Sequence, residues 1–311
     1  MKKTFLHKNQ KTFWIKLTNI AMSQLFFLSA FAVVVSLLLL IGYIFINGIK
    51  ILNVVSLHDF IFGLDWEPVT RKLYGIFPMI ITSFYVTFGA VLISAPLGIA
   101  CAVFLAEIAP LYAQEIVRPA VQLLAGIPSV IYGLFGLCFI VPIIQRFSEV
   151  AGLSILAAIL ILSIMILPTI ITISEDAIRA VPRELRESSL ALGTTKWQTI
   201  YGTVLPACSS GILTAISLGI GRAFGEAIAV KMVIGNTQTM PDLSSSSLFG
   251  LLSLARTLTT NIICDIEYAE VGPHKNALFA TGAVLFIFIM IVNGIYYFFF
   301  RRFHKVRKAI F

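Results

Sequence analysis

Two charged residues, Arg222 and Glu226, lie inside an apolar segment that reads GIGRAFGE from Gly219. On a continuous helix, residues four positions apart share one face, so the two side chains could form an ion pair. Arg222 follows Pro206 by 16 positions, which is about 24 Å along a helix. A charge that deep in a membrane costs about 2.5–3.5 kcal/mol on insertion scales, and a mutual ion pair would lower this cost.

The charge pair allows two interpretations. Arg222 can face a polar path and bind an anion there, because a planar, permanently charged guanidinium suits bidentate contact with phosphate-like oxyanions. Glu226 would then hold Arg222 in place or adjust how tightly Arg222 binds the anion. Alternatively, the pair is a structural contact between helices. We favour the first interpretation, because charges inside membranes are usually functional. Gly221 and Gly225 add a G-x-x-x-G spacing that predicts close helix packing.

The composition indicates that lipid surrounds most of the chain. Of its 311 residues, 58% are hydrophobic and 12% are charged, and the mean hydropathy is +0.94. Ordinary soluble domains carry about 25% charged residues, so a soluble, disordered or secreted disulfide-rich protein is excluded. The net charge of +8 is attributed to cytoplasmic loops and not to a nucleic-acid partner. The four cysteines form no C-x-x-C pair, so we expect no metal site.

Six apolar segments are long enough to cross a membrane. We expect helices at residues 25–47, 76–106, 119–145, 153–173, 207–235 and 278–300. With both termini in the cytoplasm, 15 of the 23 Lys and Arg residues lie on the cytoplasmic side, as the positive-inside rule requires. The chain then divides into a basic cytoplasmic N-terminus (1–24), a first membrane anchor (25–47), a periplasmic loop (48–75), a core (76–300) and a basic cytoplasmic tail (301–311). The core contains a cytoplasmic loop, 174–206, and a periplasmic loop, 236–277, with the polar stretch Ser244–Ser247.

The cytoplasmic loop 174–206 predicts two short helices. Val181-Pro182 begins the first and Gly193 ends it, because Pro is favoured at helix starts and Gly just past helix ends. Thr194 or Thr195 can cap the second, on which four apolar residues share one face: Trp197, Ile200, Tyr201 and Val204. Such a compact amphipathic unit suits docking into the groove of a soluble partner, and it equally suits a loop that rests on lipid headgroups.

The spacing of six residues in this loop resembles the E-A-A…G…I-x-L-P motif of ABC importer permeases: Glu187, Ser188, Ser189, Gly193, Leu205 and Pro206. Ser188 and Ser189 stand where the motif has paired Ala, and Thr203 stands where it has Ile. Small residues are kept at the Ala positions. The resemblance implies that the loop forms a coupling helix in a cleft of an ATPase subunit, with Glu187 and Gly193 at the contact.

Further segments resemble the permeases of phosphate-specific ABC importers: Ala125–Gly133 (AGIPSVIYG), Asp176–Gly193 (DAIRAVPRELRESSLALG) and Gly221–Val230 (GRAFGEAIAV). In the last segment Ala227 and Ile228 replace the usual Thr-Met, which leaves the charge pair intact. Ala229-Val230 after the charge pair and the ending Ala106-Glu107-Ile108 of the second span resemble one of the two permease subunits of that importer more than its sister subunit. The implied fold is that of a type I ABC importer permease: all-α, with six transmembrane helices and a cytoplasmic coupling helix between spans four and five.

The resemblance implies a permease core for phosphate import in a bacterial cytoplasmic (inner) membrane. The chain would form a heterodimer with a second permease subunit, surrounded by lipid, and would work with an ABC ATPase dimer and a periplasmic phosphate-binding protein. It contains no G-x-x-x-x-G-K-[ST] sequence, so ATP is used by the ATPase partner. This chain itself is expected to bind no cofactor and to be no enzyme. Motion of the coupling helix would switch access to Arg222 between the two sides.

Two alternative functions remain open. A permease for another oxyanion, such as sulfate, molybdate or phosphonate, could use Arg222 equally well. An ion-coupled secondary transporter or channel would not need the Glu187–Pro206 loop and usually shows internal repeats, which we do not find in the sequence. An integral-membrane enzyme is least favoured, because no nucleophile–base pair is evident.

Overall fold

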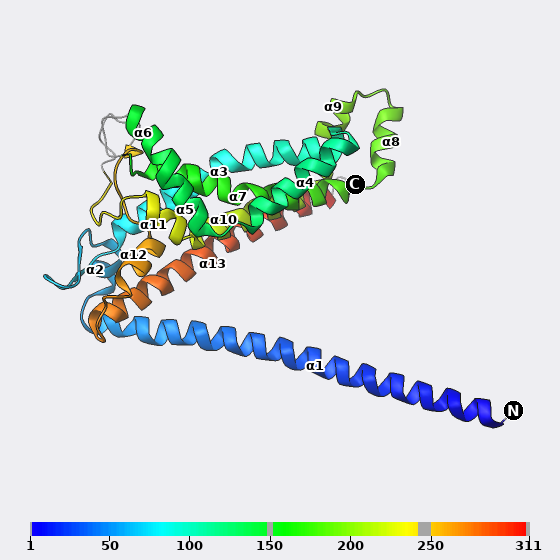
Figure 1. The fold of residues 1–311 in the computed structure, drawn as a ribbon, viewed down its shortest axis with the longest axis horizontal. Helices are drawn as coiled ribbons and strands as arrows, with labels where there is room; N and C mark the ends of the chain where they lie inside the picture. Colours follow the sequence, from blue (N-terminus) through cyan, green and yellow to red (C-terminus); the bar gives the residue numbers. More distant parts are fainter. Residues whose placement is uncertain (1, 148–151, 242–249, 309–311) are drawn as a thin grey trace.

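The computed structural model describes residues 2–147, 152–241 and 250–308, so the expected polar stretch Ser244–Ser247 lies outside the described residues. The described chain is mostly helical (Figure 1). It contains six helical stretches that are long and apolar enough to cross a membrane, which confirms the expected number of spans: Thr18–Asn53, Phe77–Ile108, Ser129–Phe147, Ile155–Arg179, Lys196–Gly225 and Pro273–Ile295.

The bounds of the elements show that several spans are built from more than one helix. In chain order the elements are α1 Lys2–Ile49, η1 Lys50–Asn53, α2 Leu57–Phe62, β1 Trp66–Glu67, β2 Leu73–Tyr74, α3 Phe77–Val103, η2 Phe104–Ile108, α4 Leu111–Gly126, α5 Ser129–Phe135, η3 Gly136–Ile140, α6 Val141–Phe147, α7 Ile155–Arg179, α8 Arg183–Ala191, α9 Lys196–Thr199, η4 Ile200–Val204, α10 Leu205–Gly225, α11 Ile228–Val233, α12 Leu258–Asp265 and α13 Pro273–Lys308. The segment η1 is a 3₁₀ helix, whereas η2, η3 and η4 are π-helical turns. Such turns insert a bulge into a helix and often occur at functional sites.

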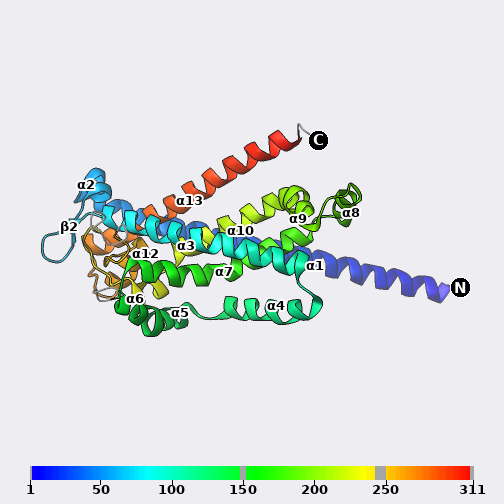
Figure 2. The same cartoon turned by 90° about the horizontal axis from the view of Figure 1, so that it is seen from above.

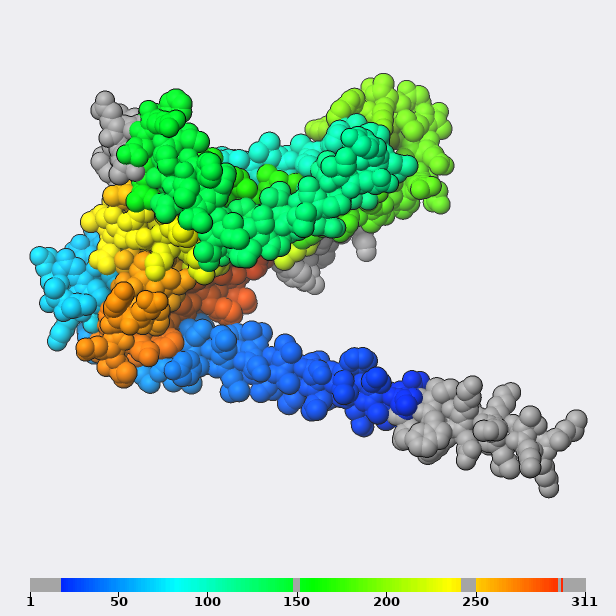
Figure 3. Space-filling model, in the orientation of Figure 1, coloured from blue at the N-terminus to red at the C-terminus, as the bar shows by residue number. Residues whose placement is uncertain are grey.

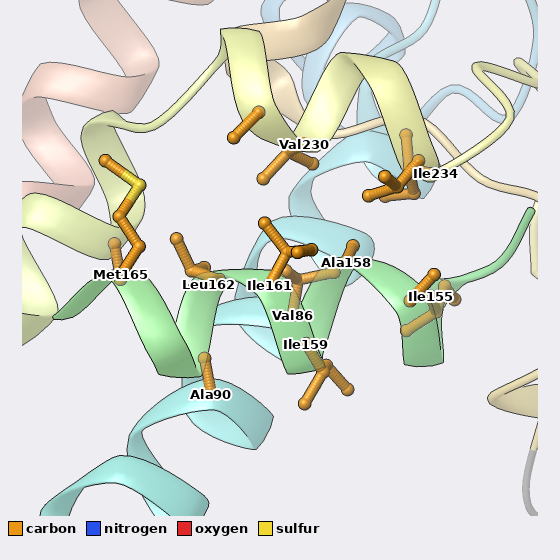
Figure 4. Packing of buried hydrophobic residues seen from close by; sticks show 14 of the residues in the cluster. Val86, Ala90, Ile155, Ala158, Ile159, Ile161, Leu162, Met165, Val230 and Ile234 are labelled. Carbon is orange, nitrogen blue, oxygen red and sulfur yellow. The ribbon is translucent and has the colours of Figure 1, made fainter. Parts of the chain in front are cut away.

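Helix α7 lies at the centre of the helical core. Ile161, Leu162 and Ile166 on this helix are almost completely buried. Helices α3 and α10 pack along α7, and α4, α5 and α11 also contact it. Figure 4 shows side chains of α3 and α11, among them Val86 and Val230, directed at this helix. Helix α7 is the most buried of the six apolar spans, so it is the element against which the rest of the core packs.

Helix α1 diverges from the bundle (Figures 1 and 3). Near its C-terminal end it packs closely on α13, where a Cβ added to Gly48 would lie 3.0 Å from the backbone of Ala280. Large apolar side chains farther back along α1, such as Phe26 and Leu39, are exposed. An exposed apolar surface of this size is expected of a helix surrounded by lipid or by another membrane subunit.

Two of the expected spans are not continuous helices, and both expectations are corrected. The third span, expected at 119–145, is interrupted at Ile127 and Pro128 between α4 and α5, because the residue before a proline is driven out of the helical conformation. The fifth span, expected at 207–235, is interrupted at Glu226 and Ala227 between α10 and α11. The short helices α5 and α11 that follow these breaks pack against each other. Non-helical backbone inside a membrane is tolerated where protein or water surrounds it.

The two ends of the helical bundle contain different secondary-structure elements. Helices α8 and α9 lie at one end, and the ends of α1 and α13 that carry the two chain termini point the same way (Figure 2). Helices α2 and α12 and the β1–β2 hairpin lie at the opposite end, where Phe60, Trp66, Tyr74 and Leu258 belong to one hydrophobic cluster. A polar network also joins the hairpin to α12. In this network Asp265 accepts hydrogen bonds from Trp66 Nε1 at 2.8 Å and from Arg256 Nη1 at 3.1 Å. The two segments expected as long loops, 48–75 and 236–277, are therefore joined by this network.

Candidate functional site

Arg222 lies in the last turn of α10 and is half-buried. Its Nη1 donates a hydrogen bond of 2.8 Å to Oγ1 of Thr169 on α7. Among the described residues, Thr169 is the one side chain that hydrogen-bonds this guanidinium. A guanidinium carries five N–H donors, so most of the donor capacity of Arg222 is left for a further ligand.

The face of α10 next to Arg222 is not covered by the described part of the chain. Leu218 is 51% exposed and Gly225 is exposed as well. A Cβ added at Gly221 or Gly225 would meet no atom within 4 Å. The predicted close packing at these glycines therefore has no partner within the described residues, and it stays a prediction about another chain.

Glu226 does not pair with Arg222 among the described ion pairs, and the expected mutual ion pair is corrected. The helical spacing on which it depended ends at Gly225, because the backbone of Glu226 is extended, with φ −74° and ψ 125°. The Glu226 carboxylate instead accepts a 3.1 Å hydrogen bond from the backbone N–H of Ala229 at the start of α11. A carboxylate is favoured there because the N-terminus of a helix carries partial positive charge. The carbonyl of Glu226 accepts a further hydrogen bond, of 2.9 Å, from Thr259 of α12.

Helix α8 confirms the first short helix expected in loop 174–206. It begins directly after Pro182, and Gly193 follows its end with φ +82°. Only glycine adopts such a left-handed conformation without steric cost. Thr195 then caps α9 through a capping box with Gln198. The second helix is not separate, however: α9 continues through the π turn η4 into α10, and Pro206 lies in the first turn of α10.

The surface of α8 is open and partly apolar. The helix has no buried residue. Glu187 and Ser188 are exposed, and so are Leu185, Leu190 and Leu192, the last at 85%. Exposed leucines beside charged residues form the kind of amphipathic surface that docks into a partner or rests on headgroups. Gly193 is exposed beside this surface, whereas Leu205 and Pro206 are half-buried at the start of α10.

Two of the three departures from the permease motif, Ser189 and Thr203, contact each other. Thr203 Oγ1 donates to Ser189 Oγ at 3.3 Å. The Ser189 hydroxyl also lies 3.0 Å from that of Thr194 and 3.2 Å from that of Thr199. These hydroxyls hold α8 against the start of the α9–η4–α10 span. A polar cluster therefore replaces the apolar contact that Ala and Ile would make, and it satisfies its own hydrogen bonds.

Sequence reasoning missed Thr169 as the partner of Arg222. The two residues are 53 positions apart, so no helical spacing connects them. Thr169 follows Pro168 inside α7, and a single hydroxyl in an apolar helix carries no signal by itself, because Thr commonly hydrogen-bonds its own helix. The packing of α10 on α7 brings the two together.

The fold and the site together define a class of protein: a multi-pass helical membrane protein with a polar site inside one span and an amphipathic helix pair at one end. The chain belongs to the family of binding-protein-dependent transport system inner membrane components, whose description matches residues 94–305. It is 44% identical, over 78% of this chain and 79% of the relative, to the probable ABC transporter permease protein YqgH of Bacillus subtilis. It is 33% identical to the phosphate transport system permease protein PstC of Pasteurella multocida, over 76% of this chain and 78% of that one.

A solved structure agrees with this assignment of the fold. A crystal structure of a bacterial alginate ABC transporter, in complex with a periplasmic protein that binds an alginate pentasaccharide, superposes with a TM-score of 0.64 and 16% identity. The superposition covers 93% of this chain and 98% of the other. The expected type I ABC importer permease fold is confirmed, and the chain is a permease subunit of an ABC transporter.

Proposed function

We propose that the chain is the PstC-type permease subunit of an ATP-driven importer of inorganic phosphate. It works with a second permease subunit, an ABC ATPase dimer and a periplasmic phosphate-binding protein. The relative from Pasteurella multocida, named as a phosphate transport permease, supports this choice of substrate. The chain supplies half of the translocation pathway, and the ATPase partner hydrolyses ATP.

The observation that carries the proposal is the open guanidinium of Arg222. It is half-buried, it makes one hydrogen bond within the described ranges, to Thr169, and it lies beside the uncovered surface of Gly221 and Gly225. A second permease packed against this surface would enclose a path with Arg222 on its wall. Guanidinium is suited to phosphate, because its N–H groups can contact two oxygens of the anion at once. Glu226, at the helix break next to this path, positions α11 and sets the local charge.

The open surface of α8 supports coupling to an ATPase. Glu187, Ser188 and Gly193 are all exposed on one short unit, and the hydroxyl of Ser189 ties that unit to the α9–η4–α10 span that carries Arg222. This end of the bundle is then cytoplasmic. The described N-terminal end of α1 and C-terminal end of α13 point the same way (Figure 2), so both chain termini are placed in the cytoplasm of a bacterium, at its inner membrane. The opposite end, with α2 and α12, receives the binding protein.

Reconstitution tests the proposal. The chain is assembled in proteoliposomes with its second permease, ATPase and binding protein, and we expect ATP-dependent uptake of labelled phosphate. Uptake is repeated with excess unlabelled phosphate, sulfate, molybdate or phosphonate. Competition by phosphate alone supports the assignment. Stronger competition by another oxyanion would make that anion the substrate, and uptake that persists without ATP would overturn the importer assignment altogether.

A further inference from the structure

Arg186 joins α8 to the end of the second span and to the end of α7. Its Nε and Nη2 donate to Oε1 of Glu107 at 3.0 and 2.7 Å. Its Nη2 also donates to the carbonyl of Ile178 at 2.8 Å, and its Nη1 donates to the carbonyl of Val181. The side chains of Arg186 and Glu107 are only 20% and 12% exposed. No residue of α8 is fully buried, so this partly buried guanidinium is the main anchor of the helix to the second span.

Glu107 lies in η2, the π turn that ends the second span. The same turn is held from α7, because Arg179 Nη2 donates to the carbonyl of Leu105 at 3.1 Å. Arg179 is itself held by Glu175, whose Oε1 accepts its Nε at 2.9 Å. The turn η2 is therefore the point at which the end of α3, the end of α7 and the helix α8 are joined by charge-assisted hydrogen bonds, which are stronger than neutral ones.

A set of charge-assisted hydrogen bonds of this kind makes the helices that it connects move together. Separating Arg186 from Glu107 would leave two mostly buried charges without an ion-pair partner, which is strongly unfavourable. A displacement of α8 therefore carries η2 with it. The segment η2 continues α3 without a break, and α3 packs on both α7 and α10. A shift at α8 is thereby passed to the helices that hold Thr169 and Arg222.

We propose that the Arg186–Glu107 ion pair is the mechanical link through which the coupling helix α8 moves the second span, and that both are positioning residues for transport. This inference rests on the proposed function, because it requires an ATPase that drives α8. The link stays closed during the cycle and is distinct from the docking surface, since Arg186 faces the bundle while Glu187 and Ser188 are exposed.

The test measures uptake per ATP hydrolysed in the reconstituted transporter, together with its thermal stability. We expect Glu107→Ala and Arg186→Ala each to lower uptake per ATP by about 2- to 30-fold, the range found for mutations along coupling networks. The ATPase should still co-purify and hydrolyse ATP. As a matched control, Glu115→Ala removes an exposed carboxylate from α4 and should leave the ratio unchanged.

The double variant Glu107→Ala/Arg186→Ala separates a link from a merely structural contact. Removing both charges leaves neither unpaired, so stability should recover toward that of the wild type. If the ion pair links α8 to the second span, uptake per ATP should stay low in the double variant although its stability recovers. A double variant that recovers both uptake per ATP and stability would overturn the inference. Single variants with the wild-type uptake per ATP would overturn it as well. A wild-type transporter without phosphate-dependent ATP hydrolysis would overturn the proposed function itself, and the link with it.

Discussion

The hydrogen bond between Thr169 and Arg222 allows a sharp test of the pathway. Thr169→Val keeps the shape of the side chain and removes the hydroxyl that accepts Nη1 of Arg222 at 2.8 Å. A hydrogen bond to a charged group contributes about 1.5–3 kcal/mol. Arg222 is only half-buried, so we expect the lower end of this range, which corresponds to about a tenfold effect. The guanidinium would turn away from the orientation in which it meets the anion.

The measurement is the initial rate of ATP-dependent phosphate uptake against phosphate concentration in proteoliposomes. Thr169→Val should lower uptake about tenfold at subsaturating phosphate, with an unchanged amount of assembled transporter. Thr169→Ser keeps the hydroxyl and should transport nearly as the wild type does. Wild-type uptake by the Val variant would show that Thr169 does not orient Arg222 for transport, and equal losses in both variants would point to packing as the cause.

Three further predictions concern the pathway, the coupling loop and the opposite end of the bundle. Arg222→Ala should abolish phosphate uptake while assembly with the partners persists, and normal uptake in proteoliposomes would reject the site. Gly193 has φ +82° and open space around it, so Gly193→Val should destabilise that turn by at least about 1–2 kcal/mol and reduce co-purification of the ATPase. Gly193→Asn should have a milder effect. A Val variant that co-purifies the same amount of ATPase as the wild type would contradict a docking role. Asp265→Ala should leave the buried Arg256 without its carboxylate partner and lower the free energy of unfolding by about 3–5 kcal/mol. The measurement is the melting temperature in detergent, which should fall. An unchanged melting temperature would show that this network does not stabilise the α12 end of the bundle.

Local signals in the sequence predicted the features that depend on local chemistry. Apolar runs of about 20 residues identified the six spans, because lipid imposes that length. Pro182 and Gly193 marked the bounds of α8, since each acts through its own backbone geometry. The permease motif located Glu187 and its neighbours on the exposed surface of α8. The roles of these residues in docking and transport stay predictions.

The tertiary structure alone decided what those residues touch. Helical spacing predicted an Arg222–Glu226 pair, but the helix ends at Gly225 and Arg222 bonds Thr169 instead. The pairing of Arg186 with Glu107 joins residues 79 positions apart. Periodicity describes neighbours on one continuous helix, whereas these contacts depend on where a helix breaks and on which helices pack together. Amino-acid types and their order therefore determined the spans and the caps of this protein. Only the packing of α3 and α10 on α7, and the contact of α8 with η2, determined how its charges are partnered.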